Sequence, residues 1–144
     1  EEYSNVVSVK VEGANTLEKI VDTKELLGDR LTIIGGMAAR FIFEELALGA
    51  DGNIPDACLT DLLTDVYKNI KSGNMVKAKE MFARYKVWLE FLSSHPGASA
   101  EIEKETLRLR GAVRCSQTRG PNVPLEEMAK LKLRELLVSI GLVS

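Results

Sequence analysis

Short runs rich in β-branched residues alternate with amphipathic segments in the first half of the chain, a pattern typical of strands that alternate with helices. The predicted strands are residues 5–11, 31–34 and 52–54. The predicted helices are residues 15–28, 37–49 and 58–73, and each closes at a glycine. Strands joined through helices pair in parallel by right-handed crossovers. We therefore expect the three strands to be neighbours in chain order.

The second half of the chain has a purely helical pattern. Amphipathic periodicity predicts helices at residues 74–94, 100–111 and 124–141, with a Gly- and Pro-containing loop before the last. Three parallel strands are too few to close a barrel, and an open sheet of three leaves both edges bare. We therefore expect a strand-bearing half, residues 1–73, and a helical extension, residues 74–144, that together form part of a larger fold.

The composition and net charge of the chain limit the kinds of molecule that it is expected to bind. Of the 144 residues, 45% are hydrophobic and 28% are charged, which is ordinary for a globular domain. The net charge of −2 favours neither nucleic acid nor an anionic membrane as a partner. No apolar run approaches the roughly 18 residues of a membrane-spanning helix. Cys58 and Cys115 are far apart, which fits a reduced compartment such as the cytoplasm.

Lys10 places a charge within the first predicted strand. Side chains alternate along a strand, so the valines at positions 7, 9 and 11 share one face, and Ser8 and Lys10 share the other. If the valines pack beneath the helices, Lys10 faces the side that forms the interior of a (β/α)₈ barrel, near the strand end where barrels carry active sites. A desolvated lysine favours its neutral amine, which attacks carbonyl carbon. The alternative is an edge-strand lysine that extends to water.

The order of these features resembles the dihydrodipicolinate synthase/N-acetylneuraminate lyase family of class I aldolases. In that family a strand ending in lysine precedes a strand ending in Ser-Gly or Gly-Gly, and the next helix ends in LGADG or similar, followed by a hydrophobic residue. The matching positions here are Lys10, Gly35, Gly36, residues 48–52 and Ile54. The resemblance covers nearly the whole chain. It implies the C-terminal half of a (β/α)₈ TIM barrel, with three βα units, plus a three-helix C-terminal extension.

The resemblance also implies roles for three residues. Lys10 would be the Schiff-base lysine that condenses with a pyruvate-like 2-keto acid. Gly36 would lie against the bound keto acid, where a side chain would clash, and Ile54 would line the same pocket. The residues by themselves leave a tight turn at Gly36 and plain core packing at Ile54 as alternatives. No metal and no organic cofactor is implied, and family members are commonly dimers of dimers, so a homotetramer is expected.

Two motifs of the family are not found in this sequence. They are the glycine- and threonine-rich loop that holds the substrate carboxylate and the proton-relaying tyrosine, both in the N-terminal half of the barrel. We therefore expect lyase activity, as aldolase or dehydratase, only together with that half, and an inactive isolated fragment. The tail after residue 104 resembles members acting on 2-keto-3-deoxy sugar acids. The alternative is a truncated or degenerate member that acts as a non-catalytic binding or regulatory protein.

The remaining polar residues favour structural roles. His95 precedes Pro96 in a helix break and is interpreted as a turn or cap residue. Asp61 and Asp65 lie one helical turn apart and are expected on a solvated face rather than in a metal site. The arginines are expected at a solvated helix end and loop, with anion binding as the alternative. They are Arg108, Arg110, Arg114 and Arg119.

Overall fold

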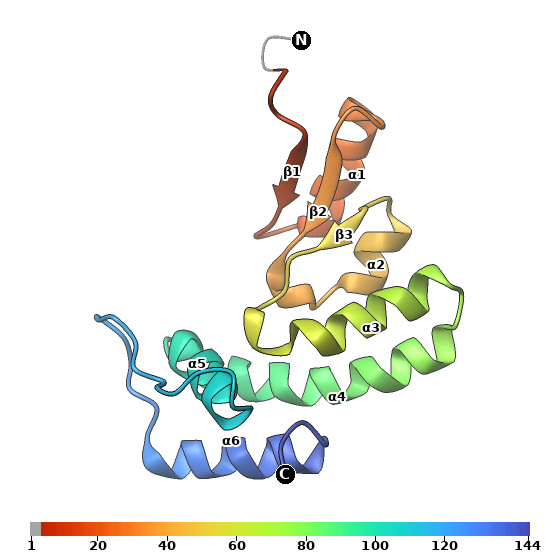
Figure 1. The fold of residues 1–144 in the computed structure, drawn as a ribbon. Coiled ribbons are helices and arrows are strands. Elements are labelled where there is room, and N and C mark those ends of the chain that lie inside the picture. Colours follow the sequence, from red (N-terminus) through yellow and green to blue (C-terminus); the bar gives the residue numbers. More distant parts are fainter. Residues whose placement is uncertain (1–3) are drawn as a thin grey trace.

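The computed structural model describes residues 4–144, and residues 1–3 of the predicted strand-bearing half lie outside the described part (Figure 1). The strands are β1 (Ser8–Val11), β2 (Thr32–Gly35) and β3 (Gly52–Asn53). The helices among and directly after them are α1 (Thr16–Leu27), the 3₁₀ turn η1 (Met37–Ala39), α2 (Ile42–Ala47), the 3₁₀ turn η2 (Ala57–Leu59) and α3 (Thr60–Lys71). The C-terminal helices are α4 (Met75–Ser93), α5 (Ser99–Leu109) and α6 (Glu127–Ser139).

The three strands form one parallel sheet in the order β1-β2-β3, which confirms the predicted neighbours. Lys10 pairs with Ile34, and Gly35 pairs with Asn53. The first strand is shorter than the predicted span of residues 5–11. The expectation that Val7 packs beneath the helices is wrong, because its side chain is 69% exposed. Only the end of the strand is covered by a helix, where Val11 packs with Ile20 of α1.

The predicted helix at residues 37–49 is divided. Met37, Ala38 and Ala39 all have positive φ angles of 52–54°, the left-handed region that non-glycine residues rarely adopt. The regular helix α2 therefore begins only at Ile42. The hydroxyl of Tyr85 in α4 donates a hydrogen bond to the carbonyl of Ala38. The helical extension therefore stabilises the turn at residues 37–39.

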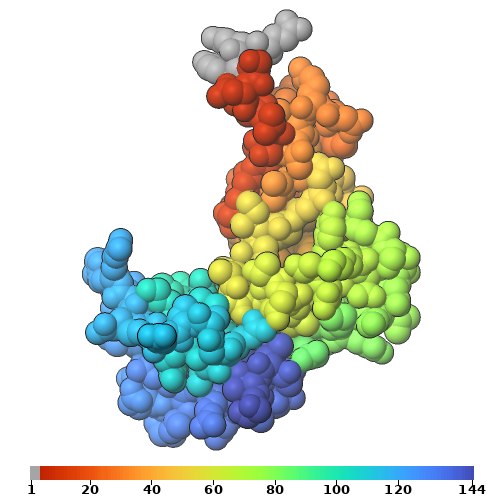
Figure 2. Space-filling model, in the orientation of Figure 1, coloured from red at the N-terminus to blue at the C-terminus, as the bar shows by residue number. Residues whose placement is uncertain are grey.

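The described residues form two hydrophobic cores, and the larger one crosses the predicted boundary between residues 73 and 74. The smaller lies between the sheet and α1, around Ile20 and Ile33. The larger joins α2 and α3 to the extension, and Trp88 and Tyr85 stack at its centre with ring centroids 5.7 Å apart. Helices α4, α5 and α6 lie beyond α3, away from β1 (Figure 1), so the strands form a narrow projection above a broader helical body (Figure 2). Among residues 4–144, no helix is long and apolar enough to cross a bilayer.

The carboxyl group of Glu103, in α5, should make the stability of the protein depend on pH. Burial and the nearby Asp56 raise the pKa of Glu103 to about 7. The pKa of Glu103 is therefore higher in the folded protein than in the unfolded chain. Its contribution to the free energy of unfolding is fully present at a pH below the pKa of an unfolded carboxyl group, and it is lost as the pH rises through about 7. Glu103→Gln should raise the free energy of unfolding near pH 8 by on the order of 1 kcal/mol and change it little near pH 4. Urea titrations at both pH values measure this.

The matched control is Glu80→Gln, at an exposed position on α4. It should change the free energy of unfolding by less than about 0.5 kcal/mol at either pH. An equal effect of Glu103→Gln at the two pH values would contradict the assignment.

Candidate active site

Lys10 lies on the face of the sheet opposite α1. Its neighbours in β1, Val9 and Val11, pack in the core beneath that helix, so alternation directs Lys10 to the other face. Its cross-strand partner Ile34 shares this face. The Lys10 side chain is 40% exposed and its Nζ lies 2.9 Å from Oε2 of Glu12. The strand therefore presents an amine on the side that becomes the interior when such a sheet closes into a barrel.

Glu12 is the residue that the sequence analysis missed. It stands two positions after Lys10, and the structure places the two side chains in contact. Its other oxygen, Oε1, accepts a hydrogen bond of 2.8 Å from the backbone N–H of Met37. The hydrogen bond from Lys10, followed by that from Met37, lowers the pKa of Glu12 below its usual range. The signal in the sequence was the spacing of two, which favours one face of a strand.

Gly36 lies directly against this pair. A Cβ atom at this position would be 2.8 Å from Cδ of Glu12 and 2.9 Å from Cε of Lys10. Its φ of −134° lies outside the left-handed region that favours glycine, and the lack of space for a Cβ atom is a separate, steric reason for glycine here. The structure thus brings Gly36 and Lys10 together at the ends of adjacent strands.

Substitution of Gly36 should change the contact between Lys10 and Glu12 more than it changes the stability of the fold. In Gly36→Ala the added methyl should displace the ends of two flexible side chains, so the free energy of unfolding should fall by less than about 1.5 kcal/mol. The Lys10–Glu12 contact should be lost, and if Lys10 is the Schiff-base lysine that the sequence resemblance implies, most trapping of a keto acid on Lys10 should be lost with it. Borohydride trapping and urea unfolding measure the two effects. Gly52→Ala is the matched control, because its Cβ would meet nothing within 4 Å; comparable loss of trapping in both variants would contradict this assignment.

Gly35, unlike Gly36, leaves space on the face of the sheet that packs against the helices. A Cβ there would overlap the carboxylate of Glu45, which is fully buried on α2. Asn53 donates hydrogen bonds from its side-chain nitrogen to Glu45 and, at 3.3 Å, to the carbonyl of Gly36. Burial raises the pKa of Glu45. Each of the two adjacent positions therefore requires glycine for its own steric reason. Gly35 leaves room for Glu45 of α2, and Gly36 leaves room for Lys10 and Glu12.

Ile54 follows β3 and is 49% exposed. Its N–H donates to the carbonyl of Gly35 at 3.1 Å, which continues the sheet pairing by one residue. Asn53 faces α2, so alternation turns Ile54 toward the face of Lys10. Asp56 follows two residues later, and burial raises its pKa while the charge of Lys10 opposes that shift. The exposed face of the sheet therefore carries an amine, a carboxylate and an apolar side chain.

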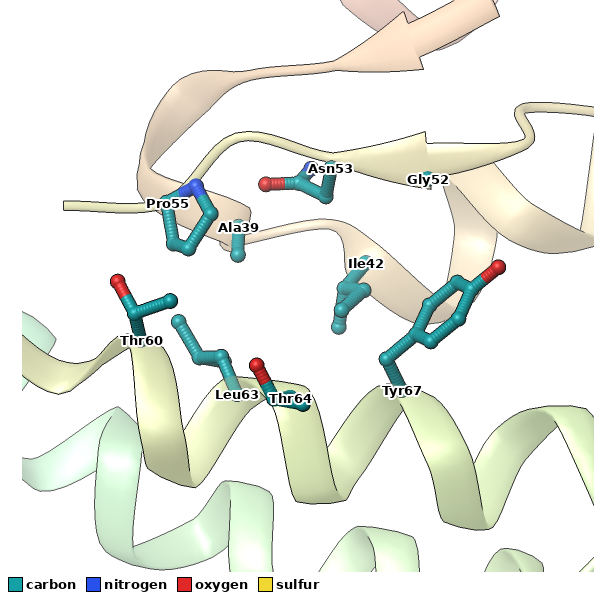
Figure 3. Close-up of a pocket in the computed structure, with 9 residues that line it drawn as sticks. All are labelled: Ala39, Ile42, Gly52, Asn53, Pro55, Thr60, Leu63, Thr64 and Tyr67. Carbon is teal, nitrogen blue, oxygen red and sulfur yellow. The ribbon is translucent and has the colours of Figure 1, made fainter. Parts of the chain in front are cut away.

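A cavity of about 200 Å³ lies elsewhere, between β3, α2 and α3 (Figure 3). Side chains of α3, among them Leu63 and Tyr67, face Ile42 and Pro55 across it. Lys10 does not line this cavity. The candidate site is therefore the open face of the sheet, and the cavity borders the edge strand β3.

Three other polar residues considered from the sequence, His95, Arg110 and Asp61, make hydrogen bonds or ion pairs within the fold. Nδ1 of His95 lies 2.9 Å from the carbonyl oxygen of Phe91, at the end of α4. Arg110 reaches from the end of α5 to both carboxylate oxygens of Asp61, at 3.0 and 2.5 Å. Asp61 therefore lies in an ion pair rather than on a purely solvated face. Within the described residues, no three His, Cys, Asp or Glu side chains are grouped as a metal site would require.

Comparison with known proteins agrees with the arrangement of strands and helices. The crystal structure of dihydrodipicolinate synthase from Rhodopseudomonas palustris superposes with a TM-score of 0.77 at 28% sequence identity. The match covers 90% of this chain and 44% of that chain, so this chain spans less than half the length of that synthase. The prediction of a partial TIM barrel with a helical extension is confirmed. Among curated proteins, none matches this sequence.

A sequence model of the dihydrodipicolinate synthetase family matches residues 1–140. This match extends over the strands, the exposed face with Lys10 and Glu12, and nearly all of the helical extension. The resemblance noted from the lysine strand, the double glycine and the LGADG segment is therefore confirmed. The chain belongs to the dihydrodipicolinate synthetase family.

Proposed function

We propose that the protein to which this chain contributes is a class I Schiff-base lyase that acts on a 2-keto acid. The observation that carries the proposal is the position of Lys10. Its amine lies at the end of a barrel strand, on the face away from the helices, beside Gly36, whose missing side chain leaves room for the Lys10 and Glu12 side chains. Catalytic residues of TIM barrels lie at this end of the strands. Gly36 and Ile54 are proposed to contact the bound keto acid.

The reaction requires only the side chains of the barrel. The neutral amine of Lys10 attacks the C2 carbonyl of the keto acid and forms a carbinolamine. Loss of water gives an iminium ion, whose positive nitrogen accepts the electron pair released when a C–C bond breaks or when a proton leaves C3. Hydrolysis of the iminium ion then restores the lysine and the ketone. Aldol cleavage and dehydration share these first steps, and the tail after residue 104 favours a 2-keto-3-deoxy sugar acid as substrate.

The rest of the barrel is needed for this chemistry. In the part of the chain described, β1 and β3 each pair on one side only. We propose that the preceding strands cover these edges and supply the groups that hold the substrate carboxylate and relay protons. Without them the face of Lys10 is open to water, so adduct formation on the isolated chain should be weak or absent. A homotetramer in the cytoplasm is proposed on the same family grounds.

Borohydride trapping tests the proposal. The protein with its complete barrel is incubated with pyruvate and sodium borohydride, and the labelled peptide is located by mass spectrometry. We expect a reduced adduct on Lys10 and much weaker labelling of the isolated chain under the same conditions. Labelling at another lysine, or at none with pyruvate and several 2-keto-3-deoxy sugar acids, would favour the non-catalytic binding protein instead.

A further inference from the structure

We infer that the buried Glu45 is a positioning residue of the candidate active site, and that it acts through the side-chain amide of Asn53. The group that it positions is the peptide between Gly36 and Met37, at the end of β2 beside Lys10. This inference rests on the proposed function. It adds to the site a residue that lies on the helix side of the sheet.

The peptide between Gly36 and Met37 is hydrogen-bonded at both of its polar groups. Its carbonyl, on Gly36, accepts a hydrogen bond of 3.3 Å from Nδ2 of Asn53 and one of 2.9 Å from the N–H of Ala39. Its N–H, on Met37, donates at 2.8 Å to Oε1 of Glu12. The carbonyl and the N–H of one planar trans peptide point in opposite directions. A contact that fixes the carbonyl therefore also fixes the N–H on the side of the candidate site.

The backbone around this peptide needs such support. Met37, Ala38 and Ala39 have φ angles of 52–54°, a region that residues with a side chain rarely adopt. Backbone in so sparsely populated a conformation persists only where surrounding contacts hold it. The hydrogen bonds to the peptide therefore decide which way its carbonyl and N–H point.

The side chain of Asn53 depends on Glu45 for its own orientation. Nδ2 of Asn53 donates to Oε2 of Glu45 and to the carbonyl of Gly36, and an amide nitrogen has one N–H for each. Within residues 4–144, Oδ1 of Asn53 and Oε1 of Glu45 are buried and have no hydrogen-bond partner. The two contacts of Nδ2 therefore orient the amide, and loss of the Glu45 acceptor would leave only the 3.3 Å contact to Gly36.

The carboxyl group of Glu45 serves as a hydrogen-bond acceptor rather than as a charge. Burial raises its pKa, against the hydrogen bonds from Asn53 and from the backbone of Gly36. The carboxylates of Glu44 and Glu12 raise the pKa of Glu45 further. Burial and nearby negative charge both favour the neutral acid. An amide oxygen at this position should therefore replace the carboxyl group.

A shift of this peptide would change the space beside the amine of Lys10. A Cβ atom at Gly36 would lie 2.9 Å from Cε of Lys10, so the backbone of Gly36 borders the lysine side chain closely. Gly36 is also proposed to contact the bound keto acid. We therefore expect loss of the Glu45 contact to weaken the binding of the keto acid.

The test is the pyruvate concentration that gives half-maximal adduct formation in the complete-barrel protein, followed by borohydride trapping. Glu45→Leu removes the acceptor and fills a similar volume, and this concentration should rise about tenfold, as expected for one lost hydrogen bond. Glu45→Gln keeps an acceptor oxygen and should recover most of the loss, to within about twofold of the wild-type value. A carboxyl group that only supported the fold would lower the amount of active protein without changing this concentration.

A double-variant cycle tests whether Glu45 acts through Asn53. Asn53→Ala should raise the half-maximal pyruvate concentration about tenfold, and Glu45→Leu in the same protein should raise it no further, because the two residues share one path. Effects that multiply would overturn the inference. Asn53 is only half-buried, so its substitution also serves where Glu45→Leu does not fold. An unchanged concentration in Asn53→Ala would then overturn the inference.

Hydrogen exchange reports the position of the peptide independently of activity. The Met37 N–H should exchange with deuterium on the order of tenfold faster in Glu45→Leu and in Asn53→Ala than in the wild-type protein. Glu44→Leu is the matched control at an exposed position of α2, and it should change neither the exchange nor the pyruvate concentration. Wild-type exchange in Asn53→Ala would overturn the inference. Absence of labelling at Lys10 in the wild-type protein would instead overturn the proposed function.

Discussion

Lys10→Met is expected to abolish the trapped adduct and to lower the lyase rate of the complete-barrel protein on the order of 1,000-fold or more, as removal of a catalytic nucleophile does. Methionine has nearly the length of lysine but no nucleophilic nitrogen. The Lys10 side chain is 40% exposed in this chain, so its replacement should change the free energy of unfolding by less than about 1 kcal/mol. Mass spectrometry after borohydride reduction and a steady-state assay measure the two consequences.

Lys24→Met is the matched control for this prediction. Lys24 also pairs with a carboxylate, that of Asp29, but it lies on α1 outside the site. Its replacement should leave trapping and rate at the wild-type level. Retention of a borohydride-stable adduct in Lys10→Met would show that another amine forms the Schiff base.

Trp88→Ala is expected to cause the largest loss of stability. The side chain is fully buried, stacks on Tyr85 and donates a 3.0 Å hydrogen bond to the hydroxyl of Thr106. Truncation leaves a cavity where α4 meets α5, at a cost of about 3–5 kcal/mol. Since domains of this size are stable by only about 5–15 kcal/mol, the helical extension should lose much of its order. Urea unfolding followed by far-UV circular dichroism measures this, because Trp88 is the only tryptophan and its fluorescence disappears with it.

The control for Trp88 is its neighbour Val87, which is 40% exposed on the same helix. Val87→Ala should change the free energy of unfolding by less than about 0.5 kcal/mol. If Trp88→Ala costs less than about 1 kcal/mol, the extension can collapse around the missing ring, and the assignment of Trp88 as its central packing residue is wrong.

Only some residues of the candidate site could be predicted from the sequence. Lys10 could be assigned to the face away from the helices because alternation along a strand is a local property. Glu12 shares that alternation, but its carboxylate becomes a specific feature only through Met37, which is 25 residues away in sequence. The two adjacent glycines looked equivalent in the sequence. Their neighbours, Glu45 on one side and Glu12 on the other, come from different elements and differentiate them.

The order of strands and helices, their parallel pairing and the purely helical second half could all be predicted from the pattern of residues. These depend on periods of two and 3.6 residues and on glycines at helix ends, which act over a few residues. Three other features became apparent only from the folded chain: Val7 is exposed, residues 37–39 form a left-handed turn, and α4 supports this turn through Tyr85. Such features depend on which segments meet in space. Local periodicity carries no information about the partner that packs against a given face.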